Sequence, residues 1–307
     1  MKRIVWLASY PKSGNTWLRM LFAAYHQTLG CPLNLDEVFR TTLSDSRRDA
    51  FAMLIGRNEF SDREVDEHRE ALQRSLAARL RPPVLVKTHN AHLRHNDFPL
   101  IRNELTLGAI YIVRNPLDIV DSVADHWGCS LDDGIGMLTN ERLMIGGDGD
   151  AMVRQYLQSW SQHVSSWINT PAFPTHLVRY EDLQSATEFT LRNVLTFLGW
   201  PIDNDRIAHA INSAQFEKLQ KQEAELGFVE RSKNSTSGRF FRNGQSGSWT
   251  NSLTKEQVDR VVDCHGDVMQ RLGYLHRSQT SHENNVQVIT RCVSKHRSVA
   301  PRSRVGL

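Results

Sequence analysis

A lysine in a short, glycine-containing loop offers the clearest chemistry in this sequence. Lys12, Ser13 and Gly14 follow an apolar run, Ile4–Ala8, and precede an apolar segment, Trp17–Gln27. The run predicts a buried strand, and the longer segment predicts a helix. A loop between a strand and a helix points backbone N–H groups and the helix N-terminus at an anion, to which Lys12 would add a positive charge. The pattern therefore predicts a site for phosphate or for a group of similar shape.

An ordinary strand-to-helix turn is the alternative interpretation, because glycine, serine and lysine are common residues. The loop also departs from the Walker A pattern, since no Gly-Lys-Ser/Thr triplet follows a glycine five residues earlier. On the residues alone, the loop is an anion site whose ligand is open.

Two ionisable side chains end a second predicted strand. Lys87 and His89 follow the apolar run Val84–Val86 and lie two residues apart, so both can face the same side. Ligands of open α/β sheets bind at the carboxyl ends of the strands. Histidine can act as a general base near neutral pH, and lysine can offset charge that develops during group transfer. The alternative is that these residues only form a polar end of the strand. We favour the functional interpretation because the predicted phosphate loop lies beside them.

A second anion site is predicted after a third strand, Leu105–Val113. Arg114 follows this strand, an Asn-Pro pair begins the next helix, and Ser122 lies two turns along it. A planar guanidinium suits a phosphate group, although an ion pair between Arg114 and Asp118 is the structural alternative. Two anion sites of different types on one sheet indicate a ligand with two separate anionic groups.

Together these motifs resemble those of the sulfotransferases that use 3′-phosphoadenosine 5′-phosphosulfate (PAPS). Four stretches are similar to motifs of that family and occur in the same order: residues 10–17, 87–89, 114–122 and 242–249. A Tyr-Glu-Asp sequence at residues 180–182 resembles a further signature. The resemblance covers roughly residues 4–274. It implies a three-layer α/β/α fold around a central parallel sheet, similar to the P-loop kinases.

The resemblance also implies a mechanism, in-line transfer of a sulfuryl group from PAPS to a hydroxyl or amine of an acceptor. The products would be the sulfated acceptor and 3′,5′-adenosine bisphosphate (PAP), and no metal ion is implied. His89 would take the acceptor proton, Lys12 would stabilise the leaving phosphate oxygen, and Lys87 would assist. The implied cofactor-binding residues are Lys12, Ser13, Gly14, Asn15, Thr16 and Trp17 in the first loop, Arg114, Ser122, Arg242, Asn243 and Gly244 around the 3′-phosphate, and Tyr180 and Phe216, with Trp17, around the adenine.

Three positions depart from the family pattern. Gln215 stands where a serine is usual, Asn243 replaces a lysine, and Ser248 replaces an aspartate. The loss of the lysine removes one charge but leaves the backbone donors that Gly244 allows to approach, so we expect a weaker grip on the nucleotide. These departures leave open an inactive relative that only binds PAPS. A P-loop phosphotransferase or NTPase is the other alternative, although its Walker pair and magnesium-binding carboxylates are not in the expected places.

The composition of the 307 residues, 40% hydrophobic and 23% charged, is typical of a soluble globular enzyme. A formal net charge of +3 is too small to favour nucleic acid as the main partner. No segment approaches the ~18 apolar residues of a membrane span. The four cysteines are widely spaced, which suits a reducing compartment. We therefore expect a cytoplasmic protein with neither a nucleic-acid nor a membrane partner, and the resemblance implies a small-molecule acceptor.

The sequence predicts one sulfotransferase-like domain, residues 1–275, and a polar, basic tail, residues 276–307, which we expect to be disordered. Helices are predicted over 153–168 and 205–222, and loops over 124–150 and 227–247. The first of these loops is expected to be a lid or to line the acceptor site. The acceptor pocket is expected to come from residues 30–60, 90–97, 124–150 and 227–241. The sequence leaves the acceptor and the oligomeric state open, with a homodimer among the alternatives.

Overall fold

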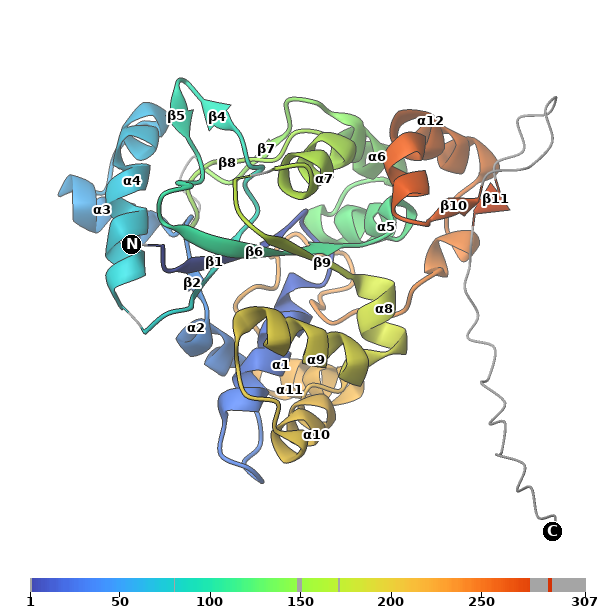
Figure 1. The fold of residues 1–307 in the computed structure, drawn as a ribbon. Coiled ribbons are helices and arrows are strands. Elements are labelled where there is room, and N and C mark those ends of the chain that lie inside the picture. The colour runs from blue at the N-terminus through green and yellow to red at the C-terminus, as the bar shows by residue number, and fades with distance from the viewer. Residues whose placement is uncertain (1, 80, 148–150, 171, 277–286, 289–307) are drawn as a thin grey trace, which may run out of the picture.

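The computed structural model describes residues 2–79, 81–147, 151–170, 172–276 and 287–288. Its centre is a parallel sheet with the strand order β2-β3-β1-β6-β9 (Figure 1). The strands are β1 (Ile4–Ser9), β2 (Leu43–Ser44), β3 (Val84–Thr88), β6 (Thr106–Val113) and β9 (Thr175–Arg179). Every neighbouring pair in this sheet is parallel, so the α/β class predicted from the sequence is confirmed.

Helices cover both faces of the sheet. They are α1 (Asn15–His26), α2 (Val38–Thr41), α3 (Arg48–Ile55), α4 (Asp62–Arg79), α5 (Pro116–Trp127), α6 (Leu131–Thr139), α7 (Trp160–Ile168), α8 (Tyr180–Ser185), α9 (Thr187–Leu198), α10 (Asn204–Ser213), α11 (Phe216–Leu226) and α12 (Lys255–Arg271). Shorter elements are the 3-10 turns η1 (Leu35–Glu37) and η2 (Ser248–Asn251) and the strands β4 (Arg94–His95), β5 (Phe98–Pro99), β7 (Met144–Ile145), β8 (Gln155–Tyr156), β10 (Leu275–His276) and β11 (Gln287–Val288).

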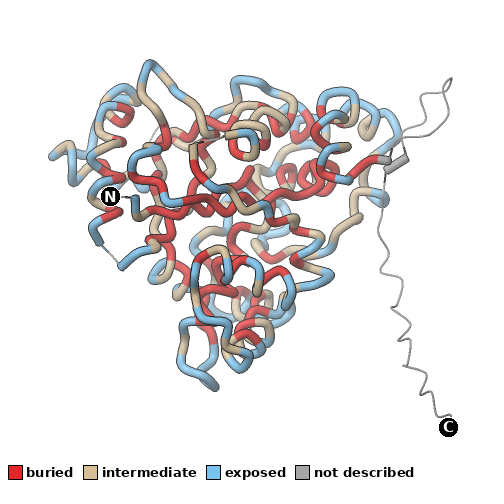
Figure 2. Tube along the Cα trace, in the orientation of Figure 1, coloured by how far each residue is buried: buried red, intermediate tan, exposed pale blue. Residues whose placement is uncertain are grey.

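The alternation of side chains along β1 divides the core into two layers. Ile4, Trp6 and Ala8 pack with α4, α5, α6, α7 and α12 on one face. Val5 and Leu7 pack with α1, α9, α10 and α11 on the other. Both faces of β1 are apolar because a parallel sheet is covered on both sides. Figure 2 shows buried residues along the sheet and on the inward sides of the helices. The three-layer arrangement is thus confirmed.

Three local predictions were wrong. The helix predicted over 153–168 begins only at Trp160, because Ser159 and Gln162 form a capping box and the preceding β8 pairs with β7. The helix predicted over 205–222 is interrupted at Ala214 and Gln215, which separate α10 from α11. The loop predicted over 124–150 contains α6, which begins after a capping box at Ser130.

Some sequence predictions concern residues that the structure does not describe. Residues 148–150 of the predicted lid lie outside the described residues. So does the predicted tail, residues 276–307, apart from residue 276 and β11, which pairs with β10 in an antiparallel arrangement. Within the described residues, no helix combines the length and the apolar character needed to span a bilayer.

Two buried histidines are part of the packing on one face of the sheet. The ring of His163 contacts the Tyr111 hydroxyl through Nδ1 at 2.7 Å and the backbone oxygen of His89 through Nε2 at 3.0 Å. His265 Nδ1 lies 2.8 Å from the Ser161 hydroxyl. Burial lowers the pKa of both histidines to about 4, so both are neutral in the folded protein near pH 7.

These shifts predict that the protein loses stability in mild acid. Below an unfolded-state pKa of about 6.5 the unfolded chain binds protons that the folded chain does not, so the free energy of unfolding decreases as pH falls from about 6.5 towards 4. Each histidine contributes up to about 1.4 kcal/mol per pH unit in that window. Urea denaturation at pH 7.5, 6 and 5 measures the slope, which His265→Gln should reduce. A free energy of unfolding that is constant over this range contradicts the prediction.

Candidate active site

The carboxyl ends of β1, β3 and β6 open onto a cavity of about 1370 Å³. In a parallel sheet these ends lie along one edge, which is where α/β proteins bind ligands. The predicted site residues that line the cavity are Lys12, Gly14, Asn15, Thr16, Trp17, Lys87, His89, Arg114, Ser122, Tyr180, Phe216, Arg242, Asn243 and Gly244. Ser13 is the exception; it is buried, and its hydroxyl has no hydrogen-bond partner among the described residues. The structure thus brings together residues separated by more than 200 positions.

The first loop turns tightly from β1 into α1. Lys12 has a φ of 69°, and Gly14 caps α1 with a φ of 99°, a left-handed conformation that favours glycine. The side chain of Asn15 points back towards the sheet, where its Nδ2 donates to the Leu7 oxygen at 2.9 Å. Asn15 therefore fixes the loop to β1 with its side chain. The cofactor contact expected of Asn15 is one of its backbone, and it stays a prediction.

Two lysines carry charge into this buried region. The Nζ of Lys12 lies 4.4 Å from the centre of the Phe240 ring, and burial lowers the pKa of Lys12 to about 8. Burial also lowers the pKa of Lys87, although the nearby Glu230 carboxylate opposes this shift. A buried cation without an anionic partner is costly, so this part of the cavity favours an anion.

His89 is held as a neutral imidazole, and its Nε2 has no hydrogen-bond partner among the residues that the structure describes. Its Nδ1 lies 2.8 Å from the backbone oxygen of Ser9, which can only accept, so Nδ1 carries the proton and Nε2 keeps a lone pair. Burial lowers the pKa of His89 to about 3, and the positive charge of Lys87 acts in the same direction. The unprotonated form is the one that a general base requires.

The backbone around His89 is fixed by a buried polar network. Asp45 accepts hydrogen bonds from the Thr88 hydroxyl at 2.9 Å and from Asn90 Nδ2 at 3.2 Å. The Trp167 indole donates to the Asn90 backbone oxygen at 3.0 Å. Asp45 was not identified from the sequence, because it lies more than 40 residues away in a segment without a recognisable motif. Its position next to a predicted catalytic strand end is apparent only in the folded chain.

Residues of the predicted 3′-phosphate site also line the cavity. Arg114 donates to the backbone oxygen of Gln245 at 2.8 Å, and Arg242 is paired with Asp121. The carboxylate of Asp118 accepts from the backbone N–H groups of Gly247 at 2.9 Å and Trp249 at 3.3 Å. Asp118 thus anchors the loop that carries Arg242, a role that the sequence did not reveal.

Aromatic side chains lie between the two groups of cations. The rings of Trp17 and Tyr180 are 5.7 Å apart at 60°, and the Tyr180 hydroxyl donates to the Gly244 oxygen at 3.0 Å. A Cβ at Gly244 would lie 2.4 Å from the Phe216 ring. The guanidinium carbon of Arg114 lies 4.3 Å from the centre of the Tyr180 ring. Glycine at 244 is therefore required by the close packing of its backbone on Phe216.

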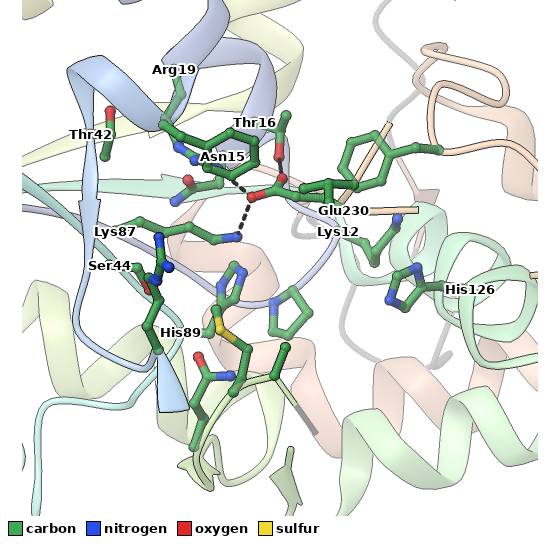
Figure 3. A pocket seen from close by; sticks show the side chains of 18 of the residues that line it. Lys12, Asn15, Thr16, Arg19, Thr42, Ser44, Lys87, His89, His126 and Glu230 are labelled. Atoms are coloured by element: carbon green, nitrogen blue, oxygen red, sulfur yellow. Dashed lines mark hydrogen bonds and ion pairs between the residues drawn. The ribbon is translucent and has the colours of Figure 1, made fainter. Parts of the chain in front are cut away.

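Glu230 is a further site residue that the sequence analysis did not identify. Its carboxylate lies among the predicted cationic groups (Figure 3), where it accepts hydrogen bonds from Thr16, Arg19 and Lys87 at 2.7, 2.8 and 3.0 Å. It belongs to the polar loop predicted over 227–247, which forms no helix or strand before η2. A glutamate in such a loop has no pattern that would distinguish it from a solvated charge.

The cavity extends beyond these groups towards segments that were predicted to line the acceptor site. Residues from three of the four predicted lining segments contribute, including Phe39, Met53, Ile145 and Val229. The fourth prediction, residues 90–97, was wrong, because none of these residues is among those that line the cavity. That segment includes β4, which forms a hairpin with β5 instead.

The packing at Gly14 makes a testable prediction about stability. A Cβ at Gly14 would lie 2.5 Å from the Tyr180 ring, whereas one at Gly56, with a φ of 85°, would meet nothing within 4 Å. Both Gly→Ala changes strain a left-handed backbone, at a cost of about 1–2 kcal/mol. Gly14→Ala should cost a further ~1–3 kcal/mol because the ring must move. Equal losses for Gly14→Ala and Gly56→Ala in urea denaturation would contradict the packing described for the loop.

Curated proteins and solved structures resemble this chain over most of its length. A flavonol sulfotransferase-like protein of Flaveria bidentis is 25% identical over 272 residues, which cover 84% of this chain and 80% of the relative. Sulfotransferase 2A6 of Rattus norvegicus is 24% identical, with 82% of this chain and 80% of the relative covered. The structure of mouse sulfotransferase SULT7A1 complexed with PAP aligns with a TM-score of 0.57 at 18% identity and covers 88% of this chain and 84% of its own.

The family itself is identified by a match to its sequence profile. The profile, described as "Sulfotransferase domain", matches residues 2–273 and so spans nearly all of the predicted first domain. This confirms the resemblance to PAPS-dependent sulfotransferases that the four sequence motifs indicated. The chain therefore belongs to the sulfotransferase domain family, and it is an enzyme that transfers a sulfuryl group.

Proposed function

We propose that this sulfotransferase moves the sulfuryl group of PAPS to a hydroxyl or amine of a small acceptor, with His89 as the general base. One observation carries the proposal: two separate groups of cationic side chains meet in one cavity with a neutral imidazole beside them. Lys12 and Lys87 form the first group, and Arg114 and Arg242 form the second. A donor with phosphate on both its 5′ and 3′ sides would engage both groups at once.

Each predicted site residue receives a role in this proposal. The backbone of residues 13–16 and the Thr16 hydroxyl would hold the 5′-phosphate at the N-terminus of α1. The 3′-phosphate would be held by Arg114, Ser122 and Arg242, with backbone groups of Asn243 and Gly244. Trp17, Tyr180 and Phe216 would surround the adenine. The structures of mouse sulfotransferase SULT7A1 and of retinol dehydratase are described as complexes with PAP, which supports this type of donor.

The proposed reaction is a direct displacement at sulfur. The acceptor oxygen or nitrogen would form a bond to sulfur while the bond between sulfur and the bridging phosphate oxygen breaks. The acceptor proton would pass to Nε2 of His89, and the electron pair of the broken bond would remain on the phosphate of PAP. Lys12 and Lys87 would neutralise charge near the transferred group. Buried charges of this kind are effective because they need no reorganisation during the reaction.

The size and lining of the cavity support a small-molecule acceptor. Apolar side chains such as Leu43, Met53 and Met152 line it together with the polar groups of Ser44 and Gln155. Such a lining suits an acceptor that has an apolar body and a few polar groups. The retinol dehydratase structures contain retinol in one case and androsterone in the other, and these are also small molecules.

We also propose a cytoplasmic location. Three cysteines in the described part of the chain, Cys31, Cys129 and Cys264, are free thiols, which supports a reducing environment. The homodimer is a hypothesis, which a measurement of the protein's molecular mass in solution tests. The cavity contains the proposed catalytic residues Lys12, Lys87 and His89, which argues against the alternative of an inactive relative. No observation favours the other alternative, a phosphotransferase or NTPase.

The role of His89 is tested by its removal. His89→Ala should reduce sulfuryl transfer by about 10²–10⁴-fold, the usual contribution of a general base. Binding of PAP should change little, because His89 is not assigned to the nucleotide. Transfer from isotopically labelled PAPS to a panel of phenols, alcohols and amines measures the rate, and calorimetry measures PAP binding. His92→Ala is the matched control, since His92 is close in sequence but does not line the cavity. Near wild-type transfer by His89→Ala would refute the assignment.

A further inference from the structure

The carboxylate of Glu230 occupies the place where the donor's 5′ anion is expected. Its Oε2 accepts from the Thr16 hydroxyl at 2.7 Å, and its Oε1 accepts from Arg19 at 2.8 Å and from Lys87 at 3.0 Å. A threonine hydroxyl has a single O–H to donate. Thr16 therefore cannot donate to a phosphate while it donates to Glu230.

Charge gives a second reason why Glu230 and a bound donor exclude one another. A carboxylate and a phosphosulfate in one buried site would repel strongly, since like charges interact at low effective dielectric there. The Glu230 side chain is only 15% exposed, so water screens this repulsion poorly. Either the carboxylate leaves when the donor enters, or the donor binds weakly.

The surroundings of Arg19 indicate that an anion must replace the Glu230 carboxylate when it leaves. Its side chain is 2% exposed and forms one ion pair among the described residues, with Glu230. Its Nε is buried and has no hydrogen-bond partner there. If Glu230 left and nothing entered, a buried guanidinium would lose its counter-charge, which is strongly unfavourable. An incoming anion that contacts Thr16, Arg19 and Lys87 would remove that cost.

The segment that carries Glu230 is fixed at both ends and has no regular structure between them. After it, the Asp125 carboxylate accepts from the Ser235 hydroxyl at 3.0 Å and from the Ser237 N–H at 2.8 Å. Before it, Phe228 is buried, with its ring 5.0 Å from that of Phe240. Residues 229–234 form no helix or strand, and Val229 is 75% exposed. The withdrawal of the carboxylate is therefore assigned to residues 229–234, between two ends that packing and hydrogen bonds hold in place.

We propose that Glu230 is an internal substitute for the 5′-phosphosulfate group, and that Arg19 is a donor-binding residue. In the free enzyme Glu230 neutralises Arg19 and Lys87. When the donor binds, residues 229–234 move outward and the donor's oxygens take over the contacts to Thr16, Arg19 and Lys87. This proposal rests on the proposed function, and it predicts that Glu230 competes with the donor.

Neutralising Glu230 tests the competition. Glu230→Gln keeps the size of the side chain but removes its charge, so PAP should bind at least about tenfold more tightly than to the wild type. Glu225→Gln is the matched control, because it removes the same charge at a position outside the cavity. Glu225 lies on α11, and its side chain is 57% exposed. The affinity of Glu225→Gln for PAP should equal that of the wild type. Calorimetric titration with PAP gives the dissociation constants.

Arg19→Gln separates donor binding from a merely structural contact. If Arg19 binds the donor, Arg19→Gln should weaken PAP binding, both alone and combined with Glu230→Gln. If Arg19 only holds Glu230 in place, Arg19→Gln should release the carboxylate and tighten PAP binding. The second result would refute the role of Arg19.

The outcomes for Glu230 are equally distinct. Equal or weaker PAP binding by a folded Glu230→Gln protein, with normal binding by the wild type, would overturn the proposal and leave the function intact. Should Glu230→Gln not fold, Glu230→Asp provides the test. The shorter aspartate side chain cannot keep all three contacts, so the Glu230→Asp protein should also bind PAP more tightly than the wild type. Absence of PAP binding in the wild type would instead contradict the proposed function, and this inference would fall with it.

Discussion

The burial of three cations beside the N-terminus of α1 is the constraint on which the rest of the site depends. Lys12, Lys87 and Arg19 are positioned by the ends of β1 and β3 and by the first turns of α1, and all are largely removed from water. An anion beside such charges offsets the cost of burying them. Glu230 is that anion for Arg19 and Lys87, whereas Lys12 lies over the Phe240 ring; in the proposed reaction the donor would neutralise all three. The same electrostatic requirement thus explains the contacts of Glu230 and the choice of ligand.

Close packing of backbone on aromatic rings links this anion site to the second one. Gly14 lies against Tyr180, and Gly244 lies against Phe216. Tyr180 in turn lies under the guanidinium of Arg114 and bonds to the Gly244 oxygen. The two cationic groups are therefore held at a fixed separation through the aromatic residues between them. Two anion sites at a fixed separation would distinguish a nucleotide with phosphate groups at both its 5′ and 3′ positions from a nucleotide with phosphates at the 5′ position alone.

The features that could be predicted from the sequence are those with a local signal. The loop at Lys12–Gly14, the strand end at Lys87 and His89, and the three-layer fold follow from short apolar runs, turn residues and motif resemblance. Asp45, Asp118 and Glu230 could not be predicted, because their contacts join residues 43 to 214 positions apart. The misplaced start of α7 has a local cause: its aromatic spacing suggested a longer helix, whereas the Ser159–Gln162 capping box fixes the boundary.

The most direct test of the central claim is a calorimetric titration of the wild-type protein with PAP and, in parallel, with ADP, both without magnesium. The two nucleotides share the adenosine and a 5′ phosphate group, but only PAP has a 3′-phosphate. Because Arg114, Ser122 and Arg242 are assigned to that phosphate, PAP should bind tightly and ADP at least about a hundredfold more weakly, since charge-assisted hydrogen bonds contribute roughly 1.5–3 kcal/mol each. Equal affinities, or no binding of either nucleotide, would contradict the assignment of two anion sites in one cavity.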